Sequence, residues 1–202
     1  MNLDELRAVV AGVPGKAWFD EAEARVRADP DTAGPLFARA ARKLGRQPLP
    51  DRPGWTAGQA GRILLLLALG EADGAAGRIA ELYWYGDPPE RLAVLHALPL
   101  LDIGAAGVPL VEDALRTNDP RLVAAALGPY ASHLDAATWR QGVVKCVFMG
   151  IPLSGVDRLD DRADETLAAM LAALASERAA AGRRMPADAV ALLNRHLLRK
   201  ED

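Results

Sequence analysis

Two polar side chains, Gln141 and Lys145, stand out within an apolar stretch of the sequence. The stretch from Trp139 to Phe148 follows a helix-capping residue and lies among helical segments, so we interpret it as a helix, although Val143–Met149 is the most strand-like run. On a helix, Gln141 and Lys145 share one face. Valines and Phe148 surround that face, so Lys145 should pair with a carboxylate, bind an anion or act chemically. Candidate acids are Asp160, Asp161, Glu177, Glu90 and Glu112.

A second group of charges joins this helix to the next one. In Leu159-Asp160-Asp161-Arg162, either aspartate is a natural N-cap for a long helix over about 161–181. Arg162 would then lie in the first turn, where the helix dipole disfavours a cation, so we expect an acid to hold it. Glu177, Arg178 and Arg183 are spaced for a surface salt-bridge network, and such a network is the alternative to a binding role for all these charges.

Three upstream polar residues have both a structural and a functional interpretation. His96 lies among Val94, Leu95 and Ala97, where a histidine is more often a satisfied core residue than a ligand. Arg116 ends one helix, where a cation complements the helix dipole or contacts a ligand. Asn118 precedes Asp119-Pro120, which is typical of a turn and a helix cap.

The sequence contains no recognisable catalytic pattern. No Ser/His/Asp arrangement, glycine-rich phosphate loop or paired-carboxylate motif stands out, and the three histidines and Cys146 are too far apart for a zinc site. Asp160-Asp161 is of the type that binds magnesium in helical prenyl-transferring enzymes, but a second acidic cluster is missing. We predict no catalytic residue, no metal and no cofactor. Cys146 should be a buried structural thiol.

Helices must position these residues. Apolar residues recur at intervals of three and four, and prolines and glycines mark about ten to twelve helices. Asp31 should cap a helix that Gly45 ends, Thr56 should cap an apolar helix through Leu69, and residues 47–54, with three prolines, should form an ordered loop. No sheet is expected.

A faint repeat suggests how the helices are arranged. Pro89 and Pro120 each open a helix and are 31 residues apart. Helical hairpins of this kind stack into solenoids, so we predict an all-α fold, an irregular right-handed α-α superhelix of the HEAT/armadillo type. A compact irregular helical bundle is the alternative.

Composition sets limits on function. The 202 residues are 50% hydrophobic and 25% charged, and 24 basic against 27 acidic residues leave a net charge of −3, which argues against nucleic-acid binding. The length predicts a single compact domain over residues 1–202. The apolar run Ile63–Leu69 is too short to span a bilayer, and the N-terminus does not resemble a signal peptide, so a cytoplasmic location is expected.

The C-terminal half resembles the EboA family. The resemblance is carried in order by Arg116-Thr117-Asn118, Pro129-Tyr130, Val144–Leu153, Arg158–Arg162 and Ser176–Arg183. It covers residues 87–186 well and Trp55–Arg62 more weakly. The resemblance implies a bacterial metabolite-traffic pathway that moves or processes a small precursor towards the cell envelope, together with a prenyltransferase-like membrane protein and enzyme-like partners.

Three functions follow from these observations. The first is a non-enzymatic adaptor that holds other proteins of the pathway. The second is a binder that holds an anionic or aromatic metabolite between Trp55, Tyr130 and Trp139, with the negative charge neutralised by Arg116, Lys145 and Arg162. The third is an enzyme. The candidates for binding a ligand or partner are Trp55, Arg62, His96, Arg116, Asn118, Tyr130, Gln141, Lys145, Asp160, Arg162 and Arg178.

Overall fold

The fold is built from α-helices, as the periodicity predicts. The structure is a computed structural model that describes the backbone of residues 1–198 and the side chains of residues 1–195. Residues 1–198 form twelve α-helices, five short 3-10 helices and one two-stranded hairpin. The chain divides into two compact units, unit 1 (Met1–Leu110) and unit 2 (Val111 onward). A single domain and a HEAT-like superhelix stay predictions.

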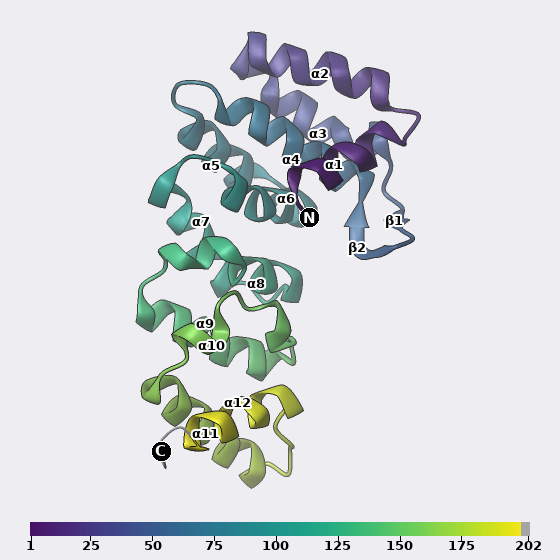
Figure 1. Cartoon of the computed structure of the whole chain (residues 1–202). Helices are drawn as coiled ribbons and strands as arrows, with labels where there is room; N and C mark the ends of the chain where they lie inside the picture. The colour runs from purple at the N-terminus through teal and green to yellow at the C-terminus, as the bar shows by residue number, and fades with distance from the viewer. Residues whose placement is uncertain (199–202) are drawn as a thin grey trace. The chain divides into compact units, whose positions relative to one another are not determined.

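Unit 1 is organised around one apolar helix, α4 (Ala57–Gly70), which packs against every other long element of the unit (Figure 1). These elements are α1 (Leu3–Ala11), α2 (Lys16–Ala28), α3 (Ala33–Leu44), α5 (Ala75–Tyr85) and α6 (Pro88–Ala97). Thr56 caps α4 as predicted, since its hydroxyl accepts the amide of Gln59 at 3.0 Å. Ile63, Leu64, Leu65 and Leu66 are all buried, and each such side chain stabilises the fold by ~1.5–3 kcal/mol.

Close contact between α3 and α4 depends on a glycine. A Cβ atom on Gly58 would lie 2.5 Å from Ala41 Cα, closer than atoms can approach. The amide of Gly58 also donates to the carbonyl of Gly45 at 2.9 Å, where Gly45, at φ +117°, ends α3 as predicted. The start of α3 differs from the prediction, because Asp29 caps a 3-10 turn (Pro30–Thr32) and α3 begins after it.

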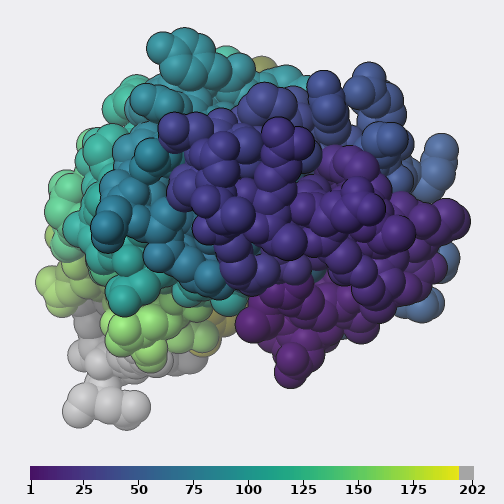
Figure 2. Space-filling model, turned by 90° about the horizontal axis from the view of Figure 1, so that it is seen from above, coloured from purple at the N-terminus to yellow at the C-terminus, as the bar shows by residue number. Residues whose placement is uncertain are grey.

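The prediction of no sheet is wrong, because the segment expected to be an ordered loop, residues 47–54, overlaps a pair of strands. Strands β1 (Pro48–Leu49) and β2 (Arg52–Thr56) pair in an antiparallel hairpin, and Arg52 is ion-paired to Glu5 of α1 at 2.5 Å. Prolines lack an amide donor but are tolerated in edge strands, and both strands of a two-stranded sheet are edges. In the space-filling view the purple and blue N-terminal segments share one face, with the hairpin at its edge (Figure 2).

The described part of unit 2 contains three helices of twelve or more residues, together with shorter helices and turns. The chain enters it through α7 (Val108–Arg116) and continues as α8 (Pro120–Ala126), the 3-10 turn Pro129–His133, α9 (Ala136–Met149), α10 (Leu159–Arg162), α11 (Glu165–Ala180) and α12 (Ala187–Leu198). The stretch Trp139–Phe148 is helical, as predicted, and packs against α8 and α11. Cys146 is fully buried in this helix, and burial raises the pKa of its thiol to about 11.

The predicted helix over 161–181 is divided in two. Ala163 adopts an extended conformation between α10 and α11, and Asp164, not Asp160 or Asp161, caps the longer helix by accepting the amide of Leu167 at 2.9 Å. Gly182, at φ +67°, follows the end of α11 as predicted. The division places Arg162 at the C-terminal end of α10, where the helix dipole favours a cation.

The glycine at the α3–α4 contact generates a stability prediction. Gly58→Ala should lower the free energy of unfolding by about 1–3 kcal/mol, because the added methyl collides with the α3 backbone. Gly77→Ala is the matched control on α5, where no atom lies within 4 Å of the added methyl, and it should raise stability by about 0.5–1 kcal/mol. Urea unfolding followed by circular dichroism measures both; equal effects would contradict the close contact.

Candidate functional site

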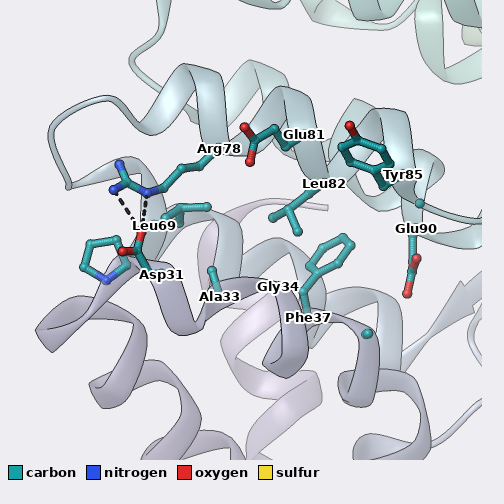
Figure 3. A pocket seen from close by; sticks show the side chains of 13 residues that line it. Asp31, Ala33, Gly34, Phe37, Leu69, Arg78, Glu81, Leu82, Tyr85 and Glu90 are labelled. Atoms are coloured by element: carbon teal, nitrogen blue, oxygen red, sulfur yellow. Dashed lines mark hydrogen bonds and ion pairs between the residues drawn. The ribbon is translucent and has the colours of Figure 1, made fainter.

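A cavity of about 600 Å³ lies in unit 1 between α3 and α5, and we call it the α3–α5 cavity (Figure 3). Its floor is apolar, with Phe37 from α3, Leu69 from α4 and Leu82 from α5. The α3 wall is made of small residues, and a Cβ on Gly34 would have only Leu82 Cδ2 nearby, at 3.9 Å. The cavity therefore has room for an apolar group against the side of α3.

One end of the cavity is bordered by an ion pair. The Nε and Nη2 atoms of Arg78 both donate to Oδ1 of Asp31, at 3.1 and 3.0 Å (Figure 3). The remaining nitrogen, Nη1, donates to the carbonyl of Asp73 at 2.9 Å. All three nitrogens of the guanidinium group are thus engaged within the protein.

At the other end, Glu90 is held by the buried Arg62. The Nη2 atom of Arg62 donates to Glu90 Oε1 at 2.7 Å, its Nε donates to the carbonyl of Phe37 at 3.1 Å, and its guanidinium carbon lies 5.3 Å from the centre of the Phe37 ring. The Arg62 and Glu90 side chains are 6% and 16% exposed. Burial lowers the pKa of Arg62, and the charge of Glu90 partly offsets this.

The face of α5 that lines the cavity carries Arg78, Glu81, Leu82 and Tyr85. Their spacing of three and four residues is the signal that they share a face, but no residue of α5 was among the sequence candidates. Of the predicted residues, Arg62 is the one that contacts the lining of this cavity, through Glu90. The neighbours that complete the site come from separate segments, so local spacing could not bring them together.

A second cavity, of about 380 Å³, lies in unit 2 between α7 and α9, and we call it the α7–α9 cavity. It brings together three predicted residues, Arg116, Gln141 and Lys145, with Glu112 and Thr138. Arg116 is exposed and lies 3.8 Å from Asp113. Gln141 is exposed and Lys145 is half-buried, which confirms that both lie on the same face of α9.

The expectation that a carboxylate holds Lys145 is wrong for the described residues, whereas binding of an anion stays a prediction. Its Nζ donates to the carbonyl of Leu115 at 2.7 Å, in the last turn of α7. Carbonyl groups at a helix C-terminus carry partial negative charge and lack partners in the helix, so a lysine there satisfies one of them. Phe148 does not enclose Lys145 either, because it is 66% exposed.

Arg162 is likewise held by main-chain carbonyls and not by an acid. It donates to the carbonyls of Ala131 and Leu134, at 2.6 and 3.0 Å, and lies 4.6 Å above the Trp139 ring. Trp139 and Tyr130 are both buried in the core of unit 2, and Tyr130 contacts the ring of His133. These contacts fix the 3-10 turn Pro129–His133 against α9.

The remaining candidates are distributed over other contacts. His96 lies 4.7 Å from Trp55 of the hairpin, ring centre to ring centre. Asp119, not Asn118, caps α8. Asp160 pairs with Arg195 at 2.9 Å beside a cavity of about 490 Å³ in unit 2. Arg178 donates to the carbonyl of Arg184 at 3.0 Å, where a network with Glu177 and Arg183 was expected.

Metal and membrane features were searched over the described residues. In residues 1–195, no group of three or more His, Cys, Asp or Glu side chains is placed to hold a metal ion. Within the described chain, no helix combines the length and apolar character needed to cross a membrane.

The fold and its cavities define an all-helical protein whose ligand-sized cavities are bordered by paired charges. A family model described as "Metabolite traffic protein EboA" matches residues 37–194. The chain therefore belongs to the EboA family, which confirms the resemblance and supports a general role in metabolite traffic. No curated protein and no solved structure matches the chain.

The buried ion pair generates a prediction for stability. Arg62→Met should lower the free energy of unfolding by about 3 kcal/mol, because Glu90 is left as a charge with little access to water. Adding Glu90→Gln should recover part of this loss, since the amide is neutral. Chemical denaturation of the single and double variants measures the effect. An unchanged free energy of unfolding in Arg62→Met would show that the ion pair does not stabilise the fold.

The half-buried His96 generates a pH prediction. Burial lowers the pKa of His96 from its ordinary value of 6.5 to about 4. Between these values the unfolded chain binds a proton and the folded one does not, so stability falls as the pH drops from 6.5 to 4. Between pH 7 and pH 4.5, the free energy of unfolding of His96→Leu should fall by about 2 kcal/mol less than that of the parent protein. Denaturation curves at both pH values provide the measurement, and parallel losses would refute the prediction.

Proposed function

We propose that this EboA-family protein binds a small molecule in the α3–α5 cavity as its part in metabolite traffic. The observation that carries the proposal is the cavity itself, about 600 Å³ with an apolar floor and charged groups at both ends. Ligand sites typically measure ~300–1,000 Å³ and combine an apolar lining with a few polar groups that set orientation.

The charges at the two ends of the cavity are paired, which favours binding over proton transfer as the role of these end groups. Asp31 and Arg78 neutralise each other, and Glu90 accepts from Arg62 and from the amide of Asp87. A general acid or base needs a free site for the transferred proton, whereas a binding site needs rigid walls. The ion pairs supply rigid ends to the cavity.

Gly34 supports the same proposal from its position in α3. A glycine in the middle of a helix costs ~0.5–1 kcal/mol relative to alanine, which is an upper bound for Gly34 because it is the second residue of α3. An added methyl group would meet no atom outside this helix closer than 3.9 Å. Packing within the chain therefore does not require glycine at this position. The space it leaves opens into the cavity.

A second candidate function is the adaptor predicted from the sequence, a non-enzymatic, cytoplasmic protein that contacts partners of a bacterial pathway delivering a precursor towards the envelope. The observation that favours it is a pair of exposed aromatic side chains at the end of α5, Trp84 at 43% and Tyr85 at 90% exposure. Exposed aromatic residues are enriched at protein–protein contacts.

Filling the cavity tests the primary proposal. Gly34→Leu should abolish retention of a small molecule from a bacterial metabolite extract, lowering the amount recovered at least tenfold, because the added side chain occupies the cavity. Gly77→Leu, an equal addition at an open site on α5 outside the lining, is the matched control and should retain the molecule. The readout is mass spectrometry of molecules released from the washed, folded protein.

Three outcomes separate the two functions. Retention by the parent and by Gly77→Leu but not by Gly34→Leu supports the cavity as the site. Equal retention by all three proteins, or none by the parent, overturns it. The adaptor gains support if a defined pathway protein binds the parent and is lost on Trp84→Glu while small-molecule retention is absent.

A further inference from the structure

The guanidinium groups at the α3–α5 cavity are already occupied. Every nitrogen of Arg78 donates to Asp31 or to the carbonyl of Asp73. Arg62 lies buried beneath the cavity and donates to Glu90 and to the carbonyl of Phe37. Asp31 and Glu90 neutralise these two guanidinium groups, so the cavity offers an anion no unbalanced positive charge.

One carboxylate in the lining is left over. Asp31 and Glu90 each face a guanidinium group, but Glu81 makes no ion pair or hydrogen bond with any residue of the described chain. The three carboxylates and the two arginines that contact them therefore leave a net charge of −1 at the cavity, carried by Glu81. In Figure 3 Glu81 lies between Arg78 and Leu82 along α5.

An aromatic ring lies on the same face of the helix. Tyr85 is four residues beyond Glu81, which places the two side chains one turn apart, and both line the cavity. The Tyr85 ring is 90% exposed, so its faces are open to a ligand. A carboxylate beside an open aromatic face attracts an ammonium group through its charge and through the negative face of the ring.

We infer that the ligand of the α3–α5 cavity is a monocation, a protonated amine attached to an apolar body. This inference rests on the proposed function. The ammonium group lies between Glu81 and Tyr85, and the apolar body covers Phe37 and Leu82 in the space left by Gly34. The charge of this ligand is opposite to that of the anion suggested by the sequence, whose expected cations, Arg116, Lys145 and Arg162, all lie in unit 2 and outside this cavity.

Three fluorescent probes with one naphthalene body test the charge preference. Dansylcadaverine ends in an ammonium group, N-pentyl dansylamide is neutral, and dansyl-6-aminohexanoate ends in a carboxylate. Fluorescence titration should show the cation binding about threefold to fivefold more tightly than the neutral probe, with the anion weakest, because Glu81 is exposed and its attraction is screened. Glu81→Gln should make the cation and the neutral probe bind equally.

Glu21→Gln is the matched control, since it removes the same charge from α2, outside the cavity lining, and should leave the preference unchanged. Equal binding of the three probes by the parent, tighter binding of the anion, or an equal effect of Glu21→Gln overturns the cation inference. In those cases, the proposed function is still supported if the parent binds the neutral probe and Gly34→Leu abolishes that binding. If the parent binds none of the probes, the cation inference fails, and retention from the metabolite extract by the parent but not by Gly34→Leu decides the proposed function separately.

Discussion

The arrangement of unit 1 depends on one buried cation. Arg62 lies on α4, donates to a carbonyl of α3 and pairs with Glu90 in the first turn of α6, so a single side chain connects three helices. Glu90 also accepts the amide of Asp87 and thereby completes the capping box that starts α6. Separating an ion pair with so little access to water would leave two buried, unpaired charges. The pair therefore fixes the position of α6 relative to α3 and α4.

Two cations of unit 2 are held in a different way, although others, such as Arg140 with Asp164, also pair with acids. Lys145 and Arg162 satisfy carbonyls at the end of α7 and in the turn Pro129–His133, where no acid takes part. The last carbonyls of a helix lack a partner within that helix and are expensive to bury unpaired. The carbonyl of Ala131 already accepts the amide of Leu134, so Arg162 adds a second donor to it. The sequence indicated that both cations need a partner, Lys145 from its apolar neighbours and Arg162 from its expected place in a first turn. Every residue carries a carbonyl, so residue types alone could not identify the acceptor.

The elements that sequence predicted well are those determined by local chemistry. The cap at Thr56, the glycine ends of α3 and α11, and the helix over Trp139–Phe148 follow from propensity and periodicity within a few residues. The hairpin over 48–56 and the break at Ala163 are flanked by contacts to residues distant in sequence, Arg52 to Glu5 and Asp164 to Arg140. The α3–α5 cavity was missed for the same reason, since its walls come from α3, α4, α5 and α6.

Two glycines in this unit show how packing and function can be told apart. At Gly58 an added Cβ would lie 2.5 Å from the α3 backbone, so the close contact of α3 and α4 accounts for the glycine. At Gly34 the nearest atom would be 3.9 Å away, so alanine is compatible with the packing and favoured by helix propensity. Stability alone therefore selects glycine at the first position and alanine at the second. A role for the open space beside Gly34 explains the difference, and that space belongs to the cavity.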